Sequence, residues 1–163
     1  VELEARKSLD FLTPQLQGLT LGANITLIQS TTKLTDTEYI NKSNVNAHVS
    51  QDRPLYDQSP YIINLDLTYA HPTSGTTVAL GANLTGERIA LVKSLGDDIY
   101  EHPPTTLDFT ISQQFWKHWT LRFGIRNLLD PEIRWTYGSS YNGDIFQSYK
   151  RGRTFSLKLL AEF

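Results

Sequence analysis

The chain has 163 residues, of which 39% are hydrophobic and 20% charged, with a formal net charge of −2 and an isoelectric point near 6.1. This balance provides no basic stripe of the kind that binds nucleic acid, so no nucleic-acid partner is predicted. Cysteine is absent, which excludes disulfides and cysteine-bound metals. The mean hydropathy is −0.33. No run of about 18 apolar residues occurs, which excludes a transmembrane helix but not a membrane-spanning barrel, because alternating strands hide their apolar face from an averaged scale.

Alternation of apolar and polar residues recurs in seven segments. In each, every second residue is mostly apolar and the residues between them are mostly polar, which predicts a strand with one apolar and one polar face. The segments are residues 1–7, 19–28, 61–69, 76–86, 107–115, 121–126 and 151–163. In the last segment Phe155, Leu157 and Leu159 share the apolar face.

The connections between these segments alternate in length. Short turns are expected at residues 8–18, 71–75 and 116–119, and long loops at 29–60, 87–104 and 128–152. No helix and no regular period is predicted in the long loops. Antiparallel strands reverse at every connection, so all long loops would lie at one end of the sheet. That asymmetry is typical of outer-membrane barrels, whereas a half-buried soluble sheet has no reason for it.

The sequence therefore predicts an all-β fold in which residues 1–163 are the last seven antiparallel strands of one transmembrane β-barrel domain. Seven strands cannot close such a barrel, because an open edge in lipid leaves backbone groups unsatisfied. Further strands are expected before residue 1 or from another chain. Aromatic residues near the strand ends, such as Tyr69 and Trp119, are predicted to form interfacial girdles.

Two stretches near the end of the chain resemble a known family. Residues 124–131 (GIRNLLDP) resemble a conserved stretch near the end of TonB-dependent outer-membrane receptors, and residues 149–155 (YKRGRTF) resemble the entry to their final strand. Phe163 matches their terminal aromatic residue. Residues 53–55 (RPL), 58–64 (QSPYIIN) and 99–103 (IYEHP) are similar to a subgroup common in Bacteroidetes-like bacteria.

The resemblance implies a large barrel of about 22 strands with a plug domain that this chain lacks. It implies a bacterial outer-membrane transporter for a bulky nutrient such as a siderophore, oligosaccharide or peptide. The partners it implies are outer-membrane lipid and the TonB–ExbB–ExbD complex, which would be reached through an N-terminal part outside this chain. It also implies the barrel-assembly machinery, which would read Phe163 as its signal, and a surface lipoprotein as a further candidate.

Two other functions remain open. One is a non-transporting outer-membrane barrel that acts as a structural or secretion-complex partner. The other is a soluble all-β carbohydrate-binding module. The four histidines are scattered, and there is no nucleophile elbow and no glycine-rich phosphate loop, so no enzyme, catalytic residue or cofactor is predicted. Acidic pairs such as Asp97-Asp98 suit calcium, but ordinary loop polarity is the commoner explanation and no metal site is predicted.

Aromatic and basic residues in the third long loop are the candidate ligand-binding residues. They are Arg134, Trp135, Tyr137, Tyr141, Phe146 and Tyr149. Exposed aromatic rings can stack on sugar rings, haem or an aromatic siderophore. The alternative is that these rings pack the loops together or anchor in lipid headgroups.

Charged residues of the presumed inner face form a second group. The residues expected to face the lumen are Asp66, Asp108, Arg122, Arg126 and Arg153. They would contact a plug or a ligand, or simply form a solvated wall. The arginines would pair with acids of the plug, or with Asp108 or Glu162 across the wall.

Overall fold

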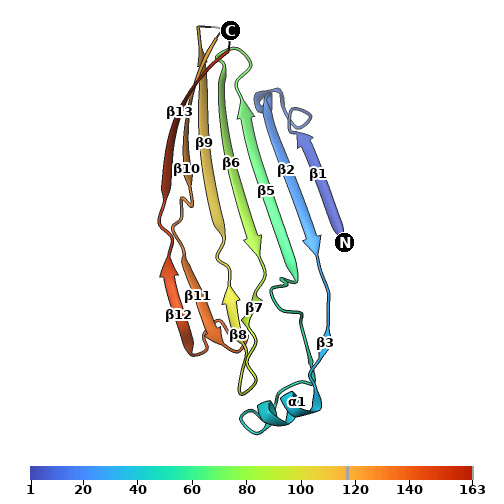
Figure 1. Ribbon diagram of the computed structural model, residues 1–163. Helices are drawn as coiled ribbons and strands as arrows, with labels where there is room; N and C mark the ends of the chain where they lie inside the picture. The colour runs from blue at the N-terminus through green and yellow to red at the C-terminus, as the bar shows by residue number, and fades with distance from the viewer. Residues whose placement is uncertain (117, 163) are drawn as a thin grey trace.

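A computed structural model describes residues 1–116 and 118–162. Within this range the fold is all-β, with three antiparallel sheets and one α-helix (Figure 1). One long sheet forms a wall, and two smaller sheets and the helix gather at one of its ends.

The wall is a seven-stranded antiparallel meander in which each strand pairs with the next along the wall. Its strands in order are β1 (Glu2–Ser8), β2 (Leu19–Leu27), β5 (Tyr61–Ala70), β6 (Thr76–Thr85), β9 (Thr106–Phe115), β10 (Trp119–Arg126) and β13 (Thr154–Ala161). The seven alternating segments predicted from the sequence are therefore confirmed as strands of one sheet. The last strand begins at Thr154 rather than at Arg151.

The strand registers keep the two faces of the wall distinct. One row runs from Leu21 through Leu67, Leu80, Phe109 and Ile125 to Phe155, with each residue opposite the next. On the other face a polar row runs Arg6, Gly22, Asp66, Gly81, Asp108. A slip of one residue in any pair would mix these faces, so the alternation itself fixes the register.

The wall has no hydrophobic core among the described residues. The buried apolar side chains are Leu34, Ile89, Ile99 and Ile133, and all four lie outside the seven wall strands. On the wall, Phe155 and Leu157 are 63% and 70% exposed. A soluble domain rarely leaves so long an apolar face uncovered.

The sheet is open within the described residues. Its order places β1 and β13 at opposite edges, and these two strands do not pair with each other. The all-β and antiparallel parts of the predicted fold are confirmed. No helix within residues 1–116 and 118–162 is long and apolar enough to cross a membrane.

The connections separate by length as the sequence predicts. The short ones, including a 3-10 turn (Pro14–Leu16), lie at one end of the wall and the long ones at the other (Figure 1). The prediction that the long loops lack regular structure is wrong. They contain β3 (Thr32–Lys33), α1 (Asp36–Ser43), β4 (Asp52–Arg53), β7 (Arg88–Leu91), β8 (Ile99–His102), β11 (Glu132–Tyr137) and β12 (Ile145–Lys150).

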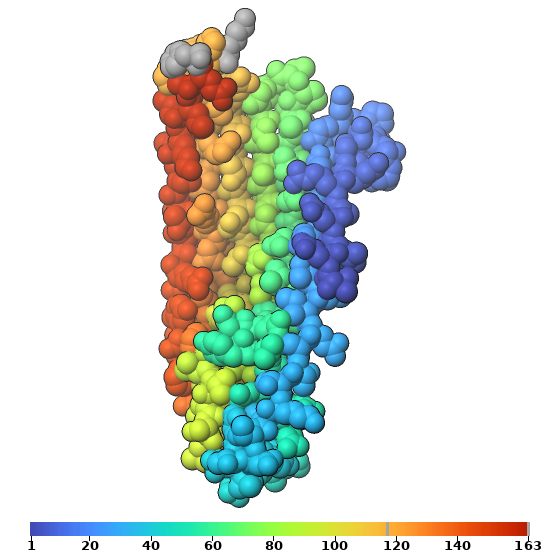
Figure 2. Space-filling model, turned by 45° about the vertical axis from the view of Figure 1, so that its right-hand side comes forward, coloured from blue at the N-terminus to red at the C-terminus, as the bar shows by residue number. Residues whose placement is uncertain are grey.

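These elements escaped prediction because they are short, and because the β8–β11 pairing joins two hairpins that belong to different connections. A second sheet has the order β12-β11-β8-β7 and joins the second and third long connections. Another sheet, β3-β4, lies within the first long connection, which also contains α1. The three connections together form a distal region beyond the wall, and Figure 2 shows part of the first long connection lying over the yellow-green second connection.

Candidate functional site

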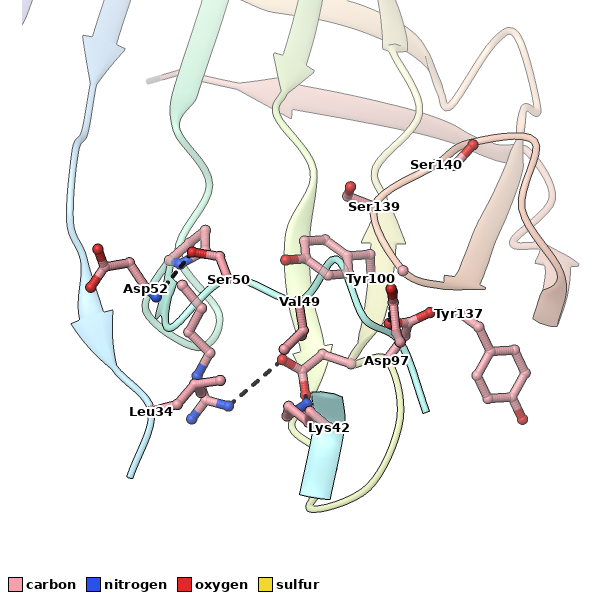
Figure 3. Close-up of a pocket in the computed structure, with 15 residues that line it drawn as sticks. Leu34, Lys42, Val49, Ser50, Asp52, Asp97, Tyr100, Tyr137, Ser139 and Ser140 are labelled. Atoms are coloured by element: carbon pink, nitrogen blue, oxygen red, sulfur yellow. Dashed lines mark hydrogen bonds and ion pairs between the residues drawn. The ribbon is translucent and has the colours of Figure 1, made fainter. Parts of the chain in front are cut away.

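A cavity of about 380 Å³ lies in the distal region where all three long connections meet (Figure 3). The first connection contributes Lys42 and Asp52, the second contributes Tyr100, and the third contributes Tyr137 and Ser139. The cavity therefore depends on three segments that lie far apart in sequence.

Helix α1 presents Lys42 to this region. The helix begins at a capping residue, Thr35, whose hydroxyl accepts a hydrogen bond from the Glu38 amide at 3.3 Å. Asp36 and Glu38 occupy the first turn and Lys42 the last, an order that complements the helix dipole.

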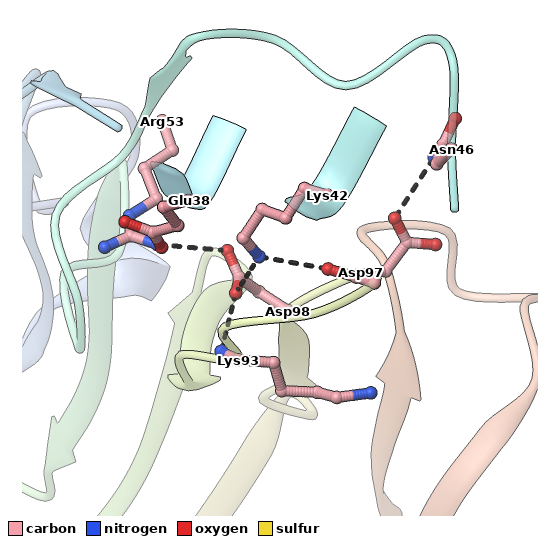
Figure 4. A network of polar contacts seen from close by, with 8 residues as sticks. Glu38, Lys42, Asn46, Arg53, Lys93, Asp97 and Asp98 are labelled. Carbon is pink, nitrogen blue, oxygen red and sulfur yellow. Dashed lines mark hydrogen bonds and ion pairs between the residues drawn. The ribbon is translucent and has the colours of Figure 1, made fainter. Parts of the chain in front are cut away.

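Lys42 is buried, with 2% of its surface exposed, and is bound at its charged end (Figure 4). Its Nζ donates to Asp98 Oδ1 at 2.6 Å and to the Gly96 carbonyl at 3.0 Å. Asp98 Oδ1 also accepts the Lys93 amide at 2.9 Å. This contact joins α1 of the first connection to the end of the β7–β8 hairpin in the second.

Arg53 extends the same network. Its guanidinium lies 2.6 Å from Glu38 and 3.6 Å from Asp98 Oδ2. Asn46 donates to Asp97 Oδ1 at 3.1 Å. Both carboxylates of the Asp97-Asp98 pair are thus engaged by protein donors, and no cluster of three metal-ligating side chains occurs in the described residues.

Tyr100 supplies a hydroxyl to the cavity wall. Burial raises the pKa of this phenol, and the nearby carboxylates of Asp98 and Glu87 raise it further, while Arg53 opposes them. The hydroxyl therefore keeps its proton and can donate a hydrogen bond. With Ser139, Ser140 and the Asp52 carboxylate, the cavity offers groups that bind a small polar ligand by hydrogen bonds.

An acid, a histidine and a hydroxyl lie in a row elsewhere in the distal region. Glu87 Oε2 is 3.4 Å from His102 Nδ1, and His102 Nε2 is 2.7 Å from Thr136 Oγ1. Thr136 is completely buried and its hydroxyl donates to the Gly138 carbonyl at 2.9 Å. The row therefore fastens β8 to β11 and offers no accessible nucleophile.

Most of the aromatic residues predicted to bind ligand pack against other side chains. Trp135 stacks on Phe146 at 6.4 Å, and Tyr137 meets Phe146 edge-on at 5.7 Å. Tyr141 contacts both the His102 ring, at 5.4 Å, and the Arg134 guanidinium, at 4.7 Å.

Tyr149 and Tyr137 occupy different positions. Tyr149 faces Ile133 across the β11–β12 pair. Tyr137 lines the cavity and is covered by the Lys93 ammonium at 4.8 Å. Most of these rings therefore contact other side chains of the protein, as the packing alternative predicts. Of the six candidate residues, Tyr137 is the one that lines the 380 Å³ cavity.

The charged residues expected on the inner face divide into two kinds. Asp66 forms an ion pair with Arg6 at 3.1 Å, and Asp108 accepts the Asn127 amide at 2.9 Å. Arg122 and Arg126 border a smaller cavity on the polar face of the wall.

Two further predictions concern the end of the chain. Arg153 directly precedes β13, and its Nε donates to the Leu128 carbonyl at 2.8 Å. Phe163, the expected assembly signal, lies outside the described residues.

The two sequence stretches that resemble the receptor family are joined to each other by hydrogen bonds in the structure. Asn127 Nδ2 donates to the Gly152 carbonyl at 2.8 Å, and the Gly152 amide donates to Asp130 Oδ1 at 3.0 Å. Asn127 and Asp130 both have positive φ, 57° and 46°, which Asn and Asp tolerate better than most residues. The motif therefore sets the point where β10 leaves the wall and β13 re-enters it.

Sequence reasoning missed Lys42, Arg53 and Tyr100 as components of the site. Lys42 and Asp98 are 56 residues apart, and the polar segments that carry them have no period that indicates burial. For Arg53 and Tyr100 the sequence offered one indication, because residues 53–55 and 99–103 resemble a subgroup of the receptor family.

No protein-family model, curated protein or solved structure matches this chain.

Proposed function

We propose that this chain supplies the closing strands of the barrel of a TonB-dependent outer-membrane transporter, and that the distal region captures its nutrient. The observation that carries the proposal is the wall itself, in which seven paired strands have an apolar face and almost nothing to cover it. Acyl chains of a membrane are the surroundings that such a face requires.

Three further features support this assignment. The apolar rows are continuous over six strands, so the lipid-facing band has no polar interruption at its centre. Short turns and long connections lie at opposite ends of the wall, as periplasmic turns and outside loops do in such barrels (Figure 1). The unpaired edges of β1 and β13 would be completed by further strands of the same barrel.

Nutrient capture is assigned to the 380 Å³ cavity of the distal region. It lies beyond the wall on the side of the long connections, and its lining combines hydroxyl, carboxylate and aromatic groups. The buried Lys42–Asp98 contact holds two of the three cavity-forming segments together, which gives the cavity a defined shape before ligand binds.

The membrane part of the proposal is tested by spin labels on adjacent residues of β5. The chain has no cysteine, so single substitutions Leu65→Cys and Asn64→Cys can be labelled without a background from this chain. In the intact protein in bilayers, the label at 65 should collide more with oxygen, which concentrates in lipid. The label at 64 should collide more with a water-soluble nickel chelate.

A second neighbouring pair, Leu157→Cys and Ser156→Cys, is the matched control on β13. Equal access of the nickel chelate to both members of both pairs would contradict the membrane assignment and favour a soluble sheet.

The transport part is tested by growth. A strain without this gene and a strain without TonB should fail on the same nutrient in a panel of iron chelates, oligosaccharides and peptides. A gene deletion that impairs growth on none of them, with the lipid-facing alternation intact, would favour the non-transporting barrel instead.

A further inference from the structure

Three basic side chains gather on the polar face of the wall at β10 and β13. Arg122 lies directly opposite Lys158 across the β10–β13 pair. Arg126 lies on the same face of β10, with Gly124 between it and Arg122. All three border one cavity of about 280 Å³.

None of these three cations has a partner in the described part of the chain. No ion pair or side-chain hydrogen bond joins the side chains of Arg122, Arg126 or Lys158 to residues 1–116 or 118–162. Like charges directly opposite each other in an antiparallel pair are destabilising. An anion bound between them would relieve this repulsion.

The carboxylate that lines the cavity forms no ion pair with these cations. Asp108 lines the same cavity, but its Oδ1 accepts the Asn127 amide in the motif that ends β10. Asp108 forms no ion pair within 4.0 Å with any described cation, so the cavity keeps an excess of positive charge.

Glycine makes the hollow between the cations. Gly124 lies between Arg122 and Arg126 on β10, and a Cβ at this position would come within 2.9 Å of Ser156 Oγ. The Ser156 and Thr110 hydroxyls border the same space. The Ser156 hydroxyl donates to the Gly124 carbonyl at 3.4 Å. The hollow therefore combines three cationic side chains with the Thr110 hydroxyl, and charged donors make the stronger hydrogen bonds to an oxyanion.

The space over a second glycine on the same face, Gly22, is filled by a carboxylate. At Gly22 a Cβ would lie 2.1 Å from Asp66 Oδ1, because the Asp66 carboxylate crosses over the glycine to reach Arg6 at 3.1 Å. That hollow holds its own carboxylate and a single cation. In the Gly124 hollow no described carboxylate pairs with the cations, since Asp108, which lines the same cavity, forms no ion pair with them within 4.0 Å.

We propose that Arg122, Arg126 and Lys158 form an oxyanion-binding site over Gly124, with a carboxylate or phosphate as ligand. The inference rests on the proposed function in one respect, that the polar face of the wall borders water rather than lipid. An adjoining cavity of about 470 Å³ shares Asp108 and Arg126 and adds Arg151, so positive charge continues from the site towards the distal region.

The test measures thermal unfolding of the intact protein in detergent, in sodium phosphate and in sodium chloride of equal ionic strength. Phosphate should raise the midpoint of the unmodified protein by about 2 °C or more, increasing with phosphate concentration. Lys158→Gln and Arg122→Gln should each lose this shift, and Lys158→Arg should keep it. Lys150→Gln, which removes one exposed charge from β12, is the matched control and should also keep it.

The same variants distinguish the two sources of the anion. A phosphate shift that Lys158→Gln abolishes identifies a free anion as the ligand. No phosphate shift, combined with a midpoint that Lys158→Gln and Arg122→Gln lower by more than Lys150→Gln does, identifies a carboxylate that another part of the protein supplies. No phosphate shift and variants no less stable than Lys150→Gln would overturn the site.

Failure of the site can be told apart from failure of the proposed function. The spin labels at positions 64 and 65 report the lipid-facing alternation on β5, three strands away from β10 in the sheet order. Folding of each variant is checked by its heat-dependent migration in gels, so that a loss of the phosphate shift is scored only in folded protein.

Discussion

The wall and the distal region treat charge in opposite ways. In the distal region Lys42 is 2% exposed and Asp98 9% exposed, and they bind each other at 2.6 Å, with Arg53 and Glu38 completing the network. On the wall, the charged side chains are exposed, and three cations at β10 and β13 stand without a partner in the described residues. The same contrast holds for apolar groups, since all four buried apolar side chains lie in the distal region.

The comparison indicates which region carries its own stability. The distal region has a small core and paired charges, so its shape is set by contacts within the chain. The wall has regular backbone pairing but exposes both faces, so its stability depends on what surrounds it. Under the proposed function, lipid covers the apolar face of the wall, and water with dissolved anions covers the polar face.

The largest expected effect comes from breaking the buried pair. Asp98→Ala would leave the Lys42 ammonium buried without its counter-ion, which costs about 3–5 kcal/mol in comparable cases. Amide hydrogen exchange of the intact protein should show lost protection in α1 and at the end of the β7–β8 hairpin, with wall strands unchanged.

The matched control replaces both partners. Lys42→Met combined with Asp98→Leu removes the charges together and should recover much of the protection. Equal loss of protection in the wall and the distal region after Asp98→Ala would contradict the independence of the two regions.

A smaller effect is expected at the glycine hollow of the wall. Gly22→Ala places a Cβ 2.1 Å from Asp66 Oδ1, so the carboxylate must move and its contact with Arg6 is lost. We expect a loss of about 1 kcal/mol in the free energy of unfolding, measured by denaturant titration in detergent. Gly81→Ala is the control on the same polar row, because nothing lies within 4 Å of its added Cβ.

The double variant sharpens this prediction. Asp66→Ala removes the obstructing carboxylate, so Gly22→Ala should cost less in that background. An equal cost in both backgrounds would show that the strand backbone at Gly22, and not the Arg6–Asp66 pair, requires glycine.

The two regions also differ in how far the sequence predicts them. The wall strands follow from alternation, because residues such as Leu157 and Ser156 alternate between faces with a period of two that tertiary contacts do not alter. The distal elements do not, because β7 and β8 have four residues each and α1 has eight, too short to display a period.

The candidate site was predicted less completely than the fold. Tyr137 was named from its loop composition, whereas Lys42 was not, since a lysine in a polar segment is usually exposed. Its burial follows from Asp98, and the sequence contains no rule that pairs two residues 56 positions apart.

Acidification should loosen the distal region before the wall. Burial lowers the pKa of His102, with Arg134 acting in the same direction and Glu87 opposing them. Because the folded-state pKa lies below 6.5, the stabilisation from neutral His102 is present above that pH and is lost as the pH falls through the lowered pKa. Hydrogen exchange in β8 and β11 should accelerate at acidic pH.

His102→Asn provides the comparison for this pH dependence, because it removes the titrating ring. The variant should exchange at a rate that changes less between neutral and acidic pH. A variant with the same pH profile as the unmodified protein would assign the loosening to another group.

The smallest effect on stability, and the most specific effect on capture, is expected from Tyr100→Phe. The substitution removes one hydroxyl from the cavity wall and leaves the ring, and no hydrogen bond of that hydroxyl to the described residues is lost. The free energy of unfolding should change by less than about 0.5 kcal/mol. Loss of one hydrogen bond to a bound nutrient should weaken its uptake at low concentration by about tenfold or less.

The nutrient used in this measurement is the one that the growth panel identifies. Tyr149→Phe, the same change on the outer hairpin away from the cavity lining, is the control and should leave uptake unchanged. If both variants impaired uptake equally, or neither did, capture would not occur in this cavity, even though the distal region remained folded.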